Sequence, residues 1–82
     1  MAHQLPIEPT LDLHAFAPHD VVSVVEEYVT TAAAAGFPVV RIIHGRSGGR
    51  VKSAVHTRLR QLGAARNVRL DPGNPGVTIV TF

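Results

Sequence analysis

The sequence contains no cysteine, so it can form neither a disulfide nor a thiolate metal site. Tryptophan is also absent, and the aromatic residues are one tyrosine and three phenylalanines. A core built from this chain must therefore consist mainly of valine, isoleucine, leucine and alanine. The lack of cysteine is typical of a reducing compartment, and we expect a cytoplasmic location.

Long apolar runs are missing as well. None approaches the roughly 20 residues that a membrane-spanning helix needs. The first ten residues, MAHQLPIEPT, have neither the basic region nor the apolar region of a secretory signal. We therefore expect no membrane partner. The 82 residues are enough for one domain and too few for two.

Positive charge is missing from the first half of the chain. Residues 1–40 contain no lysine or arginine and five of the six acidic residues, so the two halves carry formal charges of −5 and +7. A basic half dominated by arginine suits phosphate recognition, because one guanidinium group can bind two oxygens. An ordinary solvated basic surface would have the same composition, and charge alone leaves both interpretations open.

The hydrophobic pattern predicts a single α/β domain over residues 11–82, preceded by an irregular N-terminal arm over residues 1–10. Apolar residues at helical spacing indicate helices over 18–35 and 50–62. Short alternating or β-branched runs indicate strands over 11–14, 39–43, 67–70 and 77–82. The predicted order is β-α-β-α-β-β, ending in a hairpin after a turn rich in proline and glycine.

The alternation in the outer strands also predicts which side chains face the core. Leu11 and Leu13 should point inward and leave Asp12 and His14 together on the other face. In the third strand, Val68 and Leu70 should be the inward residues.

Three candidate catalytic residues stand at the ends of the first two predicted strands. They are Asp12, His14 and His44. Loops that follow parallel strands emerge at one edge of the sheet, where open α/β sheets bind ligands, so these side chains can converge there. Histidine carries protons near neutral pH, and Asp12 could act as a base or a metal ligand. The alternative is structural: both histidines could brace their loops, and Asp12 could bond backbone N–H groups.

A glycine-rich turn follows His44 and leads into the second predicted helix. Glycines allow close backbone approach to a ligand, and a helix N-terminus attracts anions. We therefore predict that this segment binds the phosphate of a nucleic acid, although such turns also occur for geometry alone. It lacks the P-loop pattern. The predicted contact residues are Gly45, Arg46, Gly48, Gly49, Arg50 and Lys52. Along the helix, Lys52, His56 and Arg60 lie opposite the apolar side.

These two segments carry a family resemblance. Leu-Asp-Leu-His at 11–14 and the run from Arg41 to Lys52 resemble the two signatures of the Smr (small MutS-related) domain, LDLHG and HGxGxG. The run 75–80, Pro-Gly-Val-Thr-Ile-Val, is similar to the family's closing strand, so the resemblance covers residues 11–82. Ala15 stands where the first motif usually has glycine, and Ser47 replaces the middle glycine of the second.

The resemblance implies a two-layer sandwich similar to the C-terminal domain of translation initiation factor three. Two helices would cover one face of a mixed four-stranded sheet. It also implies nucleic-acid binding with endonuclease (nicking) activity on DNA or RNA. Because the chain has its own Met1 and no ATPase segment, we expect a stand-alone member.

Two further functions stay open at this level: a module that binds DNA or RNA without cutting it, and a site for a small phosphorylated metabolite. No cofactor is required by the sequence. A divalent metal such as Mg²⁺ could bridge Asp12 to a substrate phosphate, and metal-assisted and purely acid–base cleavage both fit.

Overall fold

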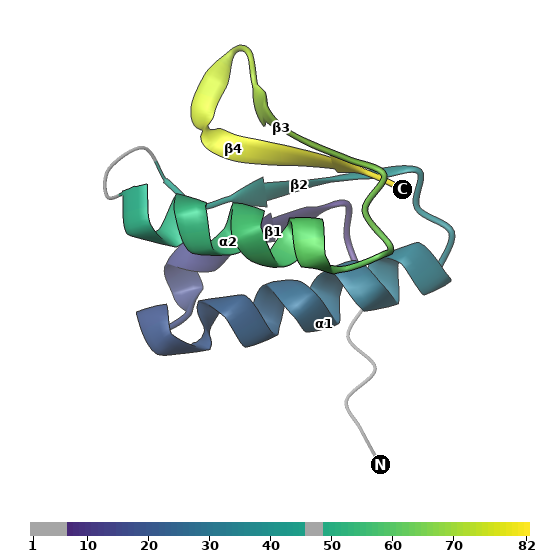
Figure 1. Ribbon diagram of the computed structural model, residues 1–82, viewed down its shortest axis with the longest axis horizontal. Coiled ribbons are helices and arrows are strands. Elements are labelled where there is room, and N and C mark those ends of the chain that lie inside the picture. The colour runs from purple at the N-terminus through teal and green to yellow at the C-terminus, as the bar shows by residue number, and fades with distance from the viewer. Residues whose placement is uncertain (1–6, 46–48) are drawn as a thin grey trace.

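The computed structural model describes residues 7–45 and 49–82, and its elements follow the predicted β-α-β-α-β-β order (Figure 1). Two 3₁₀ turns, Leu13–Ala15 and Pro18–Asp20, separate the first strand from the first helix. The strands are β1 (Thr10–Asp12), β2 (Val39–Ile43), β3 (Asn67–Asp71) and β4 (Asn74–Thr81), and the helices are α1 (Val21–Ala34) and α2 (Gly49–Gln61).

The four strands form one mixed sheet in the order β1-β2-β4-β3. β1 runs parallel to β2, whereas β4 is antiparallel to both of its neighbours, β2 and β3. Both helices lie on the same face of this sheet (Figure 1). The predicted two-layer α/β sandwich, with a mixed four-stranded sheet, is therefore confirmed.

The core fills the space between the sheet and the two helices. Small branched residues dominate it, as the shortage of aromatic residues requires. Alternate residues of the central strands β2 and β4 point toward the helices, because side chains of a strand alternate between faces. The fully buried apolar residues are Val25, Val29, Ala32, Val40, Ile42, Val55, Leu59 and Val80.

The first strand is shorter than predicted. It ends at Asp12, and Leu13–Ala15 form a 3₁₀ turn in place of the expected strand residues 13 and 14. The cause is local, since the Asp12 carboxylate accepts the backbone N–H of His14 and so turns the chain away from the sheet. Leu13 still reaches the core, with only 4% of its surface exposed.

Leu70 lies on the predicted inward face of β3, because its register partner is the buried Thr78, but it does not become part of the core. This side chain is 36% exposed, whereas Val68 packs against the core as expected. β3 is an edge strand with an irregular register between Leu70 and Asp71, so this end of the strand lies beyond the cover of α2. The hairpin is also tighter than predicted, because β4 begins at Asn74 rather than at residue 77.

The end of the predicted N-terminal arm is attached to the domain. Ile7 packs against the core, the Tyr28 hydroxyl donates a hydrogen bond to the Glu8 carbonyl, and the Pro9 carbonyl accepts one from the Arg41 N–H. Residues 1–6 of the arm lie outside the described part of the chain. Among the helices of the described part, none is long and apolar enough to cross a membrane.

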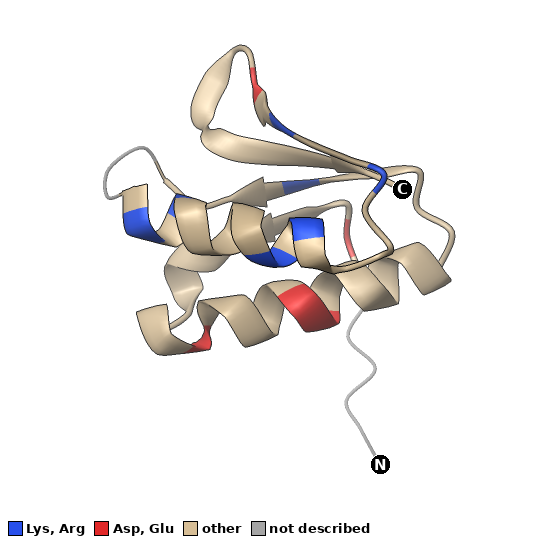
Figure 2. Ribbon diagram, viewed as in Figure 1, with Lys and Arg blue, Asp and Glu red and all other residues tan. Residues whose placement is uncertain are grey.

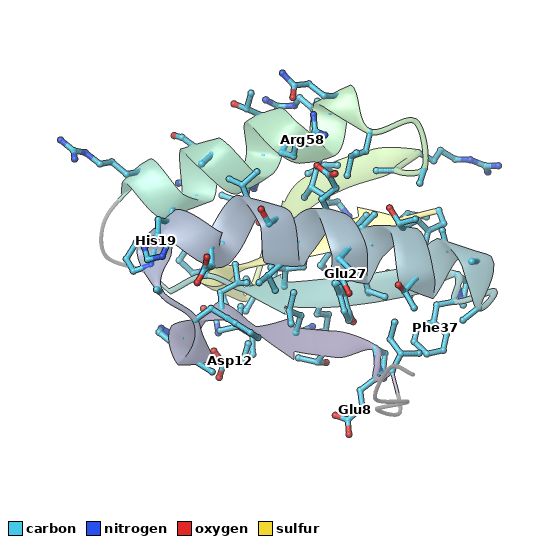
Figure 3. The ribbon with its side chains drawn as sticks, turned by 90° about the horizontal axis from the view of Figure 1, so that it is seen from below. Glu8, Asp12, His19, Glu27, Phe37 and Arg58 are labelled. Carbon is cyan, nitrogen blue, oxygen red and sulfur yellow. The ribbon has the colours of Figure 1, made fainter. Side chains whose placement is uncertain are left out.

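Two arginines of the basic half form ion pairs with carboxylates on other elements of the fold. Arg58 on α2 pairs with Glu26 on α1, and Arg41 on β2 lies 2.9 Å from a carboxylate oxygen of Asp71 on β3. Figure 2 shows basic residues along α2 and acidic residues on the neighbouring helix α1, and in Figure 3 Arg58 lies on α2, next to α1. Each of these two arginines is therefore paired with a carboxylate of the fold, in a contact that stays partly exposed to solvent.

Candidate functional site

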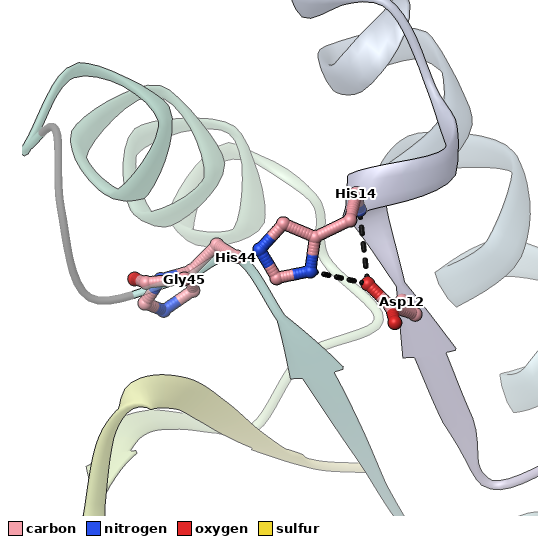
Figure 4. Close-up of polar contacts among 4 residues, drawn as sticks. All are labelled: Asp12, His14, His44 and Gly45. Carbon is pink, nitrogen blue, oxygen red and sulfur yellow. Dashed lines mark hydrogen bonds and ion pairs between the residues drawn. The ribbon is translucent and has the colours of Figure 1, made fainter.

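The register of β1 and β2 places the ends of both strands side by side. Asp12 pairs with Ile43, so the 3₁₀ turn after β1 and the residues after β2 emerge together at one edge of the sheet. Figure 4 shows the four residues at this edge, Asp12, His14, His44 and Gly45. The prediction that the residues after the first two strands emerge at one edge of the sheet is therefore confirmed for the backbone.

Asp12 and His14 form a hydrogen-bonded pair. One carboxylate oxygen, Oδ1, lies 2.9 Å from the backbone N of His14 and 2.8 Å from its ring Nδ1 (Figure 4). The backbone hydrogen bond, followed by the ring hydrogen bond, lowers the pKa of Asp12. The ionised carboxylate thus accepts Nδ1–H, which leaves a lone pair on His14 Nε2 in the neutral ring. Both side chains are exposed to solvent.

Gly45 lies directly against this ring. Its φ angle is +90°, a conformation that residues with a side chain rarely adopt. A Cβ atom added there would stand 3.0 Å from His14 Nε2. The backbone conformation therefore selects glycine at this position, and a side chain here would in addition displace the exposed His14 ring.

We expect Gly45→Ala to lower the free energy of unfolding by about 1–2 kcal/mol, the cost of a left-handed conformation with a side chain. It should also displace the His14 ring. Urea unfolding and the NMR signals of His14 check the two effects. Gly63→Ala is the control, because Gly63 has no atom within 4 Å of an added Cβ and no positive φ. Equal effects of the two substitutions would contradict this account of Gly45.

His44 is buried, with 7% of its surface exposed, and both of its ring nitrogens have partners. Nδ1 lies 3.0 Å from the Gly45 carbonyl oxygen, and Nε2 lies 2.7 Å from the hydroxyl of Thr78 on β4. The backbone N–H groups of His44 and Gly45 both donate to the carbonyl of Gly76. The start of the glycine-rich turn is thus fastened to β4.

The structure brings together only part of the predicted catalytic group. Asp12 and His14 bond to each other, and His14 lies against Gly45. His44 is at the same edge, but its ring bonds to Thr78 and Gly45 rather than to the Asp12–His14 pair. The three-residue catalytic assignment stays a prediction.

The predicted phosphate contacts lie around the N-terminus of α2. Gly49 and Arg50 open the helix and are exposed, and Lys52 is half-buried one turn further on. The first N–H groups of a helix lack intrahelical partners and carry the positive end of its dipole, which favours an anion here. Arg46 and Gly48 lie outside the described residues.

Two polar residues near the site were not among the site residues predicted from the sequence. Thr78 is completely buried, and His56 is half-buried with its Nε2 2.7 Å from the Thr78 hydroxyl. The expectation that His56 lies opposite the apolar side of its helix is wrong, because this side chain faces β4. A signal existed in β4, where Thr78 occupies an inward position two residues before buried Val80.

No group of three or more histidine and acidic side chains that could hold a metal ion occurs within residues 7–45 and 49–82. Of the three predicted catalytic residues, Asp12 and His14 are the two whose side chains contact each other in that part of the chain. A cation held by protein side chains alone is therefore not indicated by the described residues.

Comparison with known proteins adds the evolutionary context. Residues 11–82 match the Smr domain. The chain is 34% identical to the "Endonuclease MutS2" of Lachnoclostridium phytofermentans over an 85-residue alignment that covers all of this chain and 11% of that protein. It is 37% identical to the "Endonuclease MutS2" of Geobacillus thermodenitrificans, over 87% of this chain and 9% of that protein.

A solved structure is similar throughout the domain. The Smr domain of Thermus thermophilus MutS2 superposes with a TM-score of 0.79 at 25% identity, covering 88% of this chain and 94% of that one. The chain thus spans about a tenth of the curated relatives and nearly all of an isolated domain. The match over residues 11–82, together with the shared fold, shows that the chain belongs to the Smr domain family.

Proposed function

We propose that this protein binds nucleic acid and cuts one strand of it as an endonuclease, with Asp12 and His14 as the acid–base pair. The observation that carries the proposal is the Asp12–His14 hydrogen bond at the sheet edge, directly beside Gly45 and the turn that follows it. The name of the curated relatives, endonucleases that share this domain, supports it.

The substrate phosphate would lie between the His14 ring and the N-terminus of α2. Backbone N–H groups at the start of α2 and the side chains of Arg50 and Lys52 would offset its negative charge. Arg50 and Lys52 take no part in the two ion pairs that Arg41 and Arg58 form. Contacts of this kind go to the phosphate backbone, so they predict binding with little dependence on base sequence.

Cleavage would use the lone pair on His14 Nε2. The attacking oxygen, from water or from the 2′-hydroxyl of RNA, would give its proton to Nε2 as its bond to phosphorus forms. The bond from phosphorus to the leaving oxygen breaks, that oxygen takes up a proton from solvent water, and the imidazolium then returns its own proton to water. Asp12 would hold the ring by Nδ1–H and stabilise the imidazolium, as the carboxylate of a catalytic triad does.

A divalent metal such as Mg²⁺ fits this site in one way. Both hydrogen bonds from His14 go to Oδ1 of Asp12, which leaves Oδ2 for a cation. Mg²⁺ commonly binds one or two carboxylates together with substrate phosphates and would supply further charge neutralisation.

The second candidate function is binding without cleavage. It is favoured by the backbone contact of Asp12, because a carboxylate that caps a 3₁₀ turn has a structural role whether or not the ring beside it transfers protons. The two functions share the phosphate contacts and differ only in the role of the pair.

The direct test is to incubate the purified protein with supercoiled plasmid and with structured RNA, each in Mg²⁺ and in EDTA. We expect nicked plasmid or cleaved RNA, and the two metal conditions decide whether a cation takes part. Tight binding with no product under either condition would overturn the nuclease proposal and leave the binding module.

Binding should weaken steeply with salt, because neutralised phosphates release counterions. With roughly three to five phosphate contacts, the slope of log K against log salt concentration on duplex DNA should be about −3 to −5. Replacing both Arg50 and Lys52 by alanine should flatten the slope by about one unit for each lost contact.

Fluorescence anisotropy over a salt series measures this slope. The control replaces Arg66 and Arg69, two exposed arginines at β3, by alanine and removes the same net charge elsewhere. An equal loss of slope in both double variants would contradict the assignment of phosphate binding to the start of α2.

A further inference from the structure

The Thr78 hydroxyl links two histidines from different parts of the fold. Its oxygen lies 2.7 Å from Nε2 of His44, at the end of β2, and 2.7 Å from Nε2 of His56, on α2. The two rings meet edge to face, with centroids 6.2 Å apart and an angle of 72° between their planes. Thr78 is completely buried, so water does not complete its hydrogen bonding.

The Gly45 carbonyl, His44, Thr78 and His56 form a series of hydrogen bonds, and the carbonyl at one end determines the direction of each of them. A carbonyl oxygen only accepts, so Nδ1 of His44 must donate to Gly45. In the neutral ring, Nε2 of His44 is then an acceptor, and Thr78 must donate its single hydroxyl proton to it. The remaining bond can only run from Nε2–H of His56 to the Thr78 oxygen.

We propose that Thr78 and His56 are positioning residues of the candidate site: together they hold the His44 ring, and with it the Gly45 carbonyl, in place beside His14. His56 occupies the oxygen of Thr78 and so directs its proton toward His44. The hydrogen bond from Thr78 then keeps the remaining N–H of His44 on Nδ1, where it donates to Gly45.

The consequence for the site lies in Gly45. Its N–H is held by the Gly76 carbonyl and its own carbonyl by the His44 ring. A Cβ atom added to Gly45 would lie 3.0 Å from His14 Nε2, so the backbone of Gly45 is close to this ring. Gly45 also leads into the glycine-rich turn. A His44 ring that rotates or exchanges its tautomer would release the Gly45 carbonyl and shift the backbone against which His14 lies.

The charges around His56 favour its neutral form. Burial lowers the pKa of His56, followed by the positive charge of Arg60, the repulsion from His44 when that ring is protonated, and the charge of Lys52. Thr78 from β4 faces the ring without a charge, and the two nearby cations come from the same helix. If both rings were protonated, both would donate to Thr78, whose own proton would then lack an acceptor.

The test uses the free protein, without nucleic acid, and reads the tautomer of His44 from the ¹⁵N signals of its ring at pH 8. We expect the N–H on Nδ1 in the wild type and in Thr78→Ser, which keeps the hydroxyl. In Thr78→Val, which has the same shape without a hydroxyl, part of the N–H population should move to Nε2. An unchanged His44 in Thr78→Val would overturn the proposal.

A second pair of variants tests His56 and does not depend on Thr78→Val folding. His56→Gln keeps an N–H donor at this position and should leave the His44 signals close to those of the wild type. His56→Leu removes the donor and should broaden or shift them. His19→Leu, at an exposed histidine on the second 3₁₀ turn, is the control. Equal spectra for the glutamine and leucine variants would contradict the role of His56.

The pH dependence of stability provides an independent measurement. Because the pKa of His56 is lowered on folding, its contribution to stability is complete above the unfolded value of about 6.5 and is lost as pH falls through the folded value. His56→Gln cannot be protonated, so the decrease in stability below pH 6.5 should be smaller in this variant. An unchanged pH profile would show that His56 does not titrate in this chain of hydrogen bonds.

The effect on cleavage rests on the proposed function. Loss of the partners that orient the histidine ligands of metal sites costs about 10- to 100-fold in metal affinity or activity, and we expect a decrease of this order in the nicking rate for Thr78→Val at saturating protein. Affinity should change little. If the wild type does not cut, the proposed nuclease function fails while the NMR test of His44 still decides this proposal.

Discussion

Replacing His14 by alanine is expected to lower the nicking rate about 10²- to 10⁴-fold, the contribution of a positioned acid–base group. Asp12→Asn should have an effect of the same order, because it removes the charge that orients Nδ1–H and stabilises the imidazolium. The affinity for nucleic acid should change little in either variant. Rates at saturating protein, compared with affinities measured without turnover, separate the two quantities.

The chain offers a matched control for this experiment. His19 and Asp20 form another exposed histidine–aspartate pair, 3.5 Å apart, on the second 3₁₀ turn. His19→Ala therefore removes the same ring from a second histidine–aspartate pair, on a turn beside the start of α2, and at saturating protein it should cut at the wild-type rate. If His14→Ala also cuts at that rate, the catalytic assignment of His14 is wrong even though the protein is a nuclease.

Asp12 needs one additional check, because it also caps the turn through the backbone N–H of His14. Circular dichroism and urea unfolding of Asp12→Asn should show a folded domain. The Asn side-chain oxygen can still accept that N–H, so a loss of activity with the fold intact points to the lost charge rather than to a disordered turn.

Replacing Ile42 by alanine is expected to lower the free energy of unfolding by about 2–5 kcal/mol. Ile42 is completely buried in β2, between β1 and β4, and its removal leaves a cavity under both helices. In a domain of this size each kcal/mol lowers Tm by about 4–8 °C. The site follows directly after β2, so nicking and binding should disappear together at the lower melting temperature.

Thermal and urea unfolding measure this effect, with Val39→Ala as the control. Val39 lies on the same strand and is 41% exposed, so its truncation should cost less than about 1 kcal/mol. Similar destabilisation by the two substitutions would mean that burial at Ile42 does not dominate the stability of β2.

The order of the elements and the place of the site follow from local patterns in the sequence. The spacing of apolar residues separates helices from strands, and the β-α-β connection brings the residues after β1 and β2 to one edge of the sheet. Asp12 and His14 are two residues apart, so their contact is also local. These features depend on residues that are close together in the sequence, so a local pattern is enough to predict them.

The remaining features depend on partners that are far away in the sequence. The role of His56 requires Thr78, 22 residues further along, and His44 bonds to the same hydroxyl across 34 residues. The spacing of apolar residues along α2 did not reveal that His56 faces β4, and the alternation in β3 did not reveal that Leu70 extends past the cover of the helix. From the sequence, Arg58 and Arg41 are simply part of the basic half of the chain. Their partners Glu26 and Asp71 become evident only in the folded structure. A hydrogen bond, an ion pair or burial needs two surfaces in contact, and periodicity in one segment describes only one of them.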